Sequence, residues 1–125
     1  MTMTIRTHKY AELAHPLVNA IEKSEIKAKY RTLALTFPTM IMQSGLAQAL
    51  GFLMAKGNKE HITYLEHLAV LLDQADYGQM HSDILRADIT KYQRLTRNAL
   101  EASSWLKRYT QAFLEKSVSE QSSKE

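Results

Sequence analysis

The chain has 125 residues, 45% of them hydrophobic and 23% charged, with a formal net charge of +3 and no cysteine. Such a size and composition are typical of one soluble globular domain, exclude a wholly disordered chain, and allow a polyanionic partner without requiring one. The lack of cysteine excludes disulfides, thiolate zinc sites and a cysteine nucleophile, and it fits a cytoplasmic protein.

Apolar residues recur at spacings of three and four along most of the chain, which predicts an all-α fold. The first apolar stripe runs from residue 13 to 21 across Pro16, so the helix either starts afresh at Pro16 or bends there. A second stripe, residues 26–37, is predicted to end or bend at Pro38. Ser44 is the expected N-cap of a helix that begins at Leu46.

The helix that begins at Leu46 is predicted to end at Lys56 and Gly57, because a cation in the last turn and a following glycine favour a helix end. Gly51 lies inside this helix, and we attribute it to close helix packing. A further apolar stripe, residues 62–72, predicts another helix, which we expect to close near Tyr77.

The longest predicted helix lies near the C-terminal end. Its apolar residues are seven apart: Leu85, Tyr92, Ala99, Leu106 and Phe113. Asp88 falls on this stripe, where a buried carboxylate would be costly, so we predict that Asp88 caps the helix and that the chain breaks between Arg86 and Thr90. Phe113 is predicted to lie in the core, and Trp105 to be partly exposed.

Residues 1–116 are predicted to form one compact bundle of about five to six helices, followed by a polar, disordered tail at 117–125. No apolar run reaches the ~18 residues that a membrane span needs, and the first ten residues lack the apolar core of a signal peptide. We therefore expect no membrane partner and no secretion.

Catalytic chemistry has no convincing candidate in this sequence. Glu12 and His15 have the Glu-x-x-His spacing of di-iron bundles, but the spacing occurs once and such a site needs a second copy with two further Glu. The acid and histidine pairs at 60–61 and 66–67 match no zinc spacing. There is also no Gly-x-Ser-x-Gly elbow and no Gly-rich phosphate loop. We predict no catalytic residue, no metal and no cofactor.

The basic side chains offer a better candidate site. Lys27 and Arg31 are four apart and share a face of their predicted helix. In the final predicted helix, Arg97 and Arg108 point within about 20° of each other, almost opposite the apolar stripe. An ion pair of Arg97 with Glu101 could absorb part of this charge. Spacing alone therefore leaves open a solvated, salt-bridged surface.

Several segments resemble the small-subunit family of the type III-B (Cmr) CRISPR effector complexes. They are YRTLALTFP at 30–38, SGLAQALGFL at 44–53, KG at 56–57, YQRLTRNAL at 92–100 and WLKRY at 105–109. The segments occur in the family's order, and the likeness covers roughly residues 8–116. Two departures are Ser44, where Asn is expected, and Pro16, which interrupts the first helix.

The resemblance implies a helical subunit with no active site of its own, which stacks in several copies along guide RNA and target RNA beside other Cmr subunits in antiviral defence. It also implies that cleavage belongs to other subunits. The nucleic-acid-binding residues it implies are the basic residues in or beside the matching segments: Lys27, Arg31, Lys56, Arg94, Arg97, Lys107 and Arg108. From the residues alone, a helical adaptor that contacts only proteins remains an open alternative.

Overall fold

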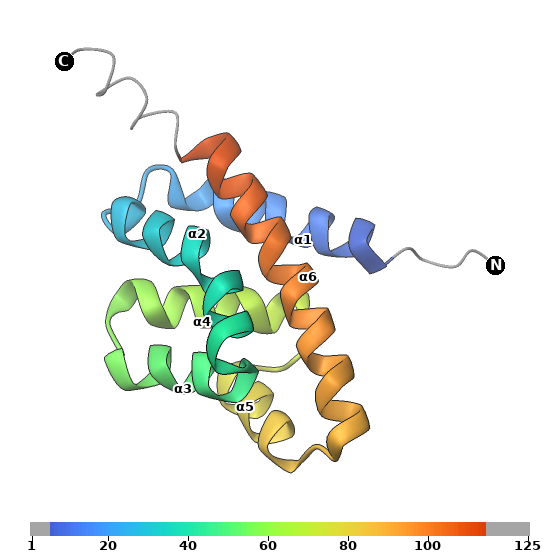
Figure 1. The fold of residues 1–125 in the computed structure, drawn as a ribbon. Helices are drawn as coiled ribbons and strands as arrows, with labels where there is room; N and C mark the ends of the chain where they lie inside the picture. The colour runs from blue at the N-terminus through green and yellow to red at the C-terminus, as the bar shows by residue number, and fades with distance from the viewer. Residues whose placement is uncertain (1–5, 115–125) are drawn as a thin grey trace.

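The computed structural model describes residues 6–114, which form six α-helices and no strand (Figure 1). The helices are α1 (Arg6–Ile21), α2 (Lys27–Ser44), α3 (Leu46–Lys56), α4 (Lys59–Leu71), α5 (Tyr77–Arg86) and α6 (Ile89–Phe113). This confirms the all-α fold with a long helix at its C-terminal end, since α6 has 25 residues. The predicted tail at 117–125 lies outside the described residues, so the domain limits stay predictions.

The helices pack around α4, which contacts each of the other five. Figure 1 shows α6 running from the corner it forms with α5 past α4 and across α1. The core is filled by large side chains with almost no exposed surface, including Tyr30, Phe37, Tyr64 and Leu106. One side of α6 is therefore buried against α1, α2 and α4, and its other side is free to carry charge.

Both prolines lie inside helices. α1 continues through Pro16, with Ala14 and Val18 fully buried on either side, while Pro16 itself is exposed. The helix therefore does not start afresh at Pro16. α2 likewise continues past Pro38 to Ser44, so of the two predicted alternatives, an end or a bend, the end at Pro38 does not occur. Burial of one helix face on both sides of a proline offsets the hydrogen bond that its missing N–H costs.

At the junction between α2 and α3, the N-cap differs from the predicted Ser44. Ser44 is the last residue of α2, and Gly45 takes the N-cap position of α3 with a φ of 87° and no capping side chain of its own. The backbone N–H of Ala47 donates instead to the hydroxyl of Tyr92 in α6, at 3.2 Å. Ser44 cannot cap because its backbone is helical, and an N-cap residue must leave the helical conformation.

The ends of α3 and α4 differ in chemistry. Gly57 follows α3 in the left-handed conformation, as predicted. α4 ends at Leu71, so the predicted end near Tyr77 is wrong, and Tyr77 starts α5. Asp73 takes the left-handed conformation with φ 60°, and the N–H of Gln74 donates to the carbonyl of Ala69 at 2.9 Å. The helix therefore ends in a Schellman motif with aspartate in the left-handed position. Glycine is the usual residue there, so a sequence signal based on glycine does not find this helix end.

The predicted break at Asp88 is confirmed. α5 ends at Arg86, and α6 begins at Ile89. Asp88 has an extended backbone, and its Oδ1 accepts a hydrogen bond from the N–H of Lys91 at 2.8 Å. The carboxylate is exposed and satisfies one of the free N–H groups of the first turn, so it is not buried in the apolar stripe.

Two further packing predictions are wrong. A Cβ added at Gly51 would meet no atom within 4 Å, so close packing does not explain this glycine. Phe113 is only partly buried, like Trp105, and its ring makes a T-shaped contact with His15 at a centroid distance of 5.1 Å. The partial exposure predicted for Trp105 is confirmed.

Candidate nucleic-acid interface

α6 carries the most compact set of the predicted basic residues. Ala99 and Leu106 are fully buried, whereas Arg94, Arg97 and Arg108 are exposed. At 100° per residue the three arginines fall within about 60° of one another, centred opposite the buried side chains. They therefore form one charged row along the outer face of the helix.

Lys107 lies beside this row rather than on it. Its direction differs from that of Arg108 by about 100°, and its side chain is half-buried. Lys107 and Arg108 nevertheless line one small hollow of about 210 Å³ together with Ser104 and Gln111. The C-terminal half of α6 thus offers two cations to one recess.

The basic pair on α2 is less accessible. Lys27 and Arg31 are both half-buried at the edge of the face that packs into the core. The Nε of Arg31 is buried and has no hydrogen-bond partner among the described residues. These two cations therefore share one helix face, as predicted, but present less of their charge to solvent than the arginines of α6.

Lys56 lies apart from the other predicted residues. It is exposed at the end of α3, with its Nζ 5.4 Å from the ring centroid of Phe52. Figure 1 shows this end of α3 well separated from α6. The seven predicted residues therefore do not form a single patch, and α6 is the element that holds four of them.

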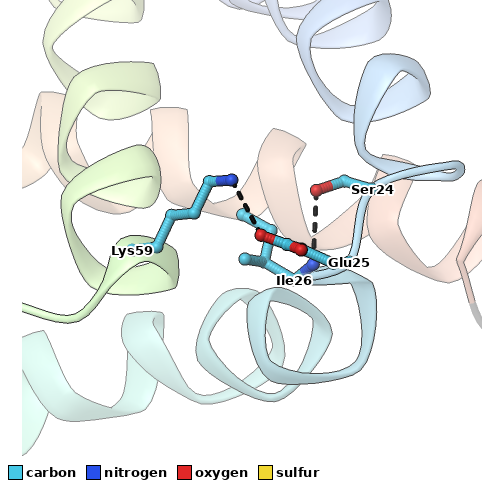
Figure 2. Close-up of polar contacts among 4 residues, drawn as sticks. All are labelled: Ser24, Glu25, Ile26 and Lys59. Carbon is cyan, nitrogen blue, oxygen red and sulfur yellow. Dashed lines mark hydrogen bonds and ion pairs between the residues drawn. The ribbon is translucent and has the colours of Figure 1, made fainter.

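Another lysine is held by an acid. Lys59, in the first turn of α4, forms an ion pair with Glu25 at 3.0 Å (Figure 2). The hydroxyl of Ser24 accepts a hydrogen bond from the N–H of Ile26 at 3.2 Å and shapes the α1–α2 turn that presents Glu25. Both charged side chains are exposed, so the pair contributes about 0–1 kcal/mol, but it gives Lys59 a local partner.

Comparison with known proteins agrees with this architecture. The sequence matches the family described as CRISPR-associated protein (Cas_Cmr5) over residues 6–113. The chain belongs to the Cmr5 family. The Cmr5 subunit of the CRISPR Cmr system of Thermus thermophilus is 34% identical over 113 residues, which are 90% of this chain and 99% of that protein. The resemblance found in the sequence is thereby confirmed.

The similarity extends to three dimensions. The crystal structure of a CRISPR-associated Cmr5 family protein from Thermus thermophilus has a TM-score of 0.86 at 34% identity. The alignment covers 90% of this chain and all of that one. The six-helix arrangement is therefore a Cmr5 fold throughout the matched length, and the α6 arginines lie inside the matched residues.

Two members of the acid and histidine pairs of this Cmr5 chain, His15 and Glu66, serve packing and a helix start. His15 lies edge-on to Tyr109, with ring centroids 5.3 Å apart. The carboxylate of Glu66 accepts a hydrogen bond from the N–H of Tyr77 at 3.1 Å, at the start of α5. Within residues 6–114 no group of three or more His, Cys, Asp or Glu is placed to hold a metal ion. In the same range no helix is both long and apolar enough to cross a membrane.

One buried polar contact could not be found from the sequence. The hydroxyl of Tyr30 in α2 lies 2.7 Å from Nδ1 of His67 in α4. Burial lowers the pKa of His67 to about 4 and raises the pKa of Tyr30 above its usual value. Tyr30 and His67 are therefore both neutral, and the hydrogen bond between them joins α2 to α4 in a partly buried position.

Proposed function

We propose that this Cmr5-family chain is the small subunit of a type III-B (Cmr) CRISPR ribonucleoprotein, which assembles with other Cmr subunits in antiviral defence. The observation that carries the proposal is the 34% identity with the Cmr subunit of Thermus thermophilus, which extends over 99% of that protein. The family match over residues 6–113 includes all six helices of the fold, which supports a shared role in the assembly.

We further propose that the subunit contacts the RNA backbone through lysine and arginine. The exposed row of Arg94, Arg97 and Arg108, with Lys107 beside it, supports this assignment. Cations on a rigid helix neutralise phosphates without reading base sequence, and they release counterions as they do so. Lys27, Arg31 and Lys56 are secondary candidates, because two are half-buried and the third lies apart.

Contacts with protein are proposed for the exposed apolar side chains. Met42 is 76% exposed, and Leu85 and Ile89 at the α5–α6 corner are 63% and 71% exposed. These residues support docking of other Cmr subunits or of further copies of this chain. We propose a non-catalytic role in the cytoplasm with no cofactor, since the sequence holds no recognisable nucleophile or phosphate loop and cleavage would lie with other subunits.

The experiment is a reconstituted Cmr complex that carries a fourfold alanine variant at Arg94, Arg97, Lys107 and Arg108. Target-RNA affinity is measured over a range of salt concentrations. We expect weaker binding, and a log–log salt slope lower by ~0.7 for each phosphate contact that is lost. Melting of the isolated subunit should change little, because the effects of such surface substitutions on stability lie within about ±0.5 kcal/mol each and have either sign.

The matched control removes four positive charges elsewhere. Its four substitutions are Lys23→Ala, Lys29→Ala, Lys59→Ala and Arg86→Ala, all at exposed positions. This variant has the same net charge as the first, so a general electrostatic effect would weaken both equally. If the α6 variant assembles normally and holds target RNA with unchanged affinity and slope, the protein-only adaptor becomes the better description.

A further inference from the structure

The C-terminal half of α6 and the start of α1 enclose a recess that combines an aromatic ring with a cation. It has a volume of about 500 Å³. Its lining residues are Thr7, Glu101, Ser104, Trp105 and Arg108. The smaller hollow that contains Lys107 also includes Ser104 and Arg108, so the two recesses adjoin along α6. We call the pair the Trp105 groove.

Trp105 is held in a fixed position within this groove. Its indole N–H donates to the hydroxyl of Thr7, which lies 98 residues away in the sequence. Its ring also meets that of Tyr109, with centroids 5.7 Å apart. Because the indole donor already has a partner, the half-exposed ring offers a ligand apolar surface rather than a hydrogen bond. The groove therefore pairs a fixed aromatic surface with charge.

We infer that the Trp105 groove binds one nucleotide step of single-stranded RNA, with a base against the ring of Trp105 and a neighbouring phosphate on Arg108 and Lys107. Aromatic rings stack on bases of any sequence, and cations track the backbone. A duplex keeps its bases stacked inside, so it cannot place one against Trp105. Arg108 and Lys107 are the cations that line the groove, so they form its phosphate-binding end.

This inference rests on the proposed function for the identity of its ligand as RNA, but it makes a narrower claim. Backbone tracking alone needs only exposed cations, which Arg94 and Arg97 also supply. The aromatic component is particular to the Trp105 groove. A contact with bases near Trp105 is therefore what separates the two ideas experimentally.

The first test is photocrosslinking in the reconstituted Cmr complex, with 4-thiouridine placed in either the guide RNA or the target RNA. Trypsin cleaves after Arg97 and Lys107, so Trp105 is released in the peptide of residues 98–107. We expect a crosslink in this peptide from one of the two RNAs, and the labelled strand then identifies the source. If neither RNA crosslinks to this peptide, the inference is wrong.

The second test compares Trp105→Phe with Trp105→Leu in the same complex. Phenylalanine keeps an aromatic surface but loses the hydrogen bond to Thr7, whereas leucine loses the aromatic ring as well. We expect Trp105→Leu to weaken single-stranded RNA binding roughly tenfold, and Trp105→Phe to bind within about threefold of the wild type. Equal affinity of both variants and the wild type would overturn the inference, and melting curves identify any variant that is unfolded.

Variants at the two ends of the α6 row separate this inference from the proposed function. Lys107→Ala with Arg108→Ala should abolish the crosslink at Trp105, whereas Arg94→Ala with Arg97→Ala should retain it. If the Arg94 and Arg97 variant alone weakens RNA binding and Trp105→Leu does not, RNA binding stands and the Trp105 groove is refuted. If no variant weakens binding, both proposals fail.

Discussion

Acid should destabilise this fold through His67. His67 is half-buried, and its Nδ1 lies 2.7 Å from the hydroxyl of Tyr30, which can donate to the neutral ring. Protonation would turn Nδ1 into a donor, so that the Tyr30 hydroxyl would have to accept, and it would place a charge in a site that is largely shielded from water. Burial accordingly lowers the pKa of His67 from 6.5 to about 4. Desolvation therefore favours the neutral histidine in the folded chain.

The magnitude follows from the difference between the folded and unfolded pKa of His67. Between pH 6.5 and pH 4 the unfolded chain binds the proton more readily than the folded chain, so stability falls as the pH falls through this range. Each pH unit is worth ~1.4 kcal/mol, which gives a loss of ~2 kcal/mol at pH 5 and ~3 kcal/mol in all by pH 4. Above pH 6.5 this histidine adds no pH dependence.

The assay is urea unfolding of the full chain at pH 7.5 and pH 5, compared with a His67→Asn variant. The asparagine oxygen can accept the hydrogen bond from Tyr30 but does not titrate, and every other acid and histidine is shared. We expect the wild type to lose ~2 kcal/mol more than the variant between the two pH values. Equal losses would show that His67 does not titrate as inferred.

Other predictions concern single positions on the helices. Gly51→Ala should raise stability by ~1 kcal/mol in thermal or urea unfolding, because the added Cβ meets nothing within 4 Å. Gly45→Ala should lower the stability by at least ~1 kcal/mol, because φ is 87° and the added Cβ would lie 3.4 Å from the hydroxyl of Tyr92. Equal effects at the two glycines would contradict this reasoning. Asp88→Ala should cost ~1 kcal/mol while Asp88→Asn stays near the wild type, and helix loss should be visible by circular dichroism if α6 frays.

Helix positions were predictable where a single residue type decides the local backbone. Asp88 on an apolar stripe predicted the break before α6, and Lys56 with Gly57 predicted the end of α3. The prolines were not decisive in this way. Pro16 and Pro38 each remove one backbone hydrogen bond, but the helix faces around them are buried against other helices. The stabilisation from this packing depends on which helices meet, so it cannot be calculated from the sequence.

Contacts between segments that are distant in the sequence could not be predicted from it. The hydroxyl of Tyr92 caps α3 from 45 residues away, and Tyr30 bonds to His67 across 37 residues. Neither pair has a spacing that predicts it, because both depend on which helix faces meet. Local preference alone favours Ser44 as the cap, but the hydroxyl of Tyr92 accepts the hydrogen bond from the N–H of Ala47 instead.

The candidate interface shows the same division between local pattern and tertiary context. Periodicity correctly placed Arg97 and Arg108 on the outer face of α6, where packing of α1, α2 and α4 on the other side holds the helix rigid. Arg94 and Arg108 lie ~21 Å apart along the helix axis. Because the helix fixes the spacing of their backbones, the protein loses less conformational entropy when it binds an RNA strand. Arg97 and Lys107 are separated by ~15 Å along the axis, so the two ends of the row lie apart. We therefore expect the two ends of α6 to contribute separately to RNA affinity, so that the effects of the Arg94 and Arg97 variant and of the Lys107 and Arg108 variant should add within ~0.5 kcal/mol in the fourfold variant.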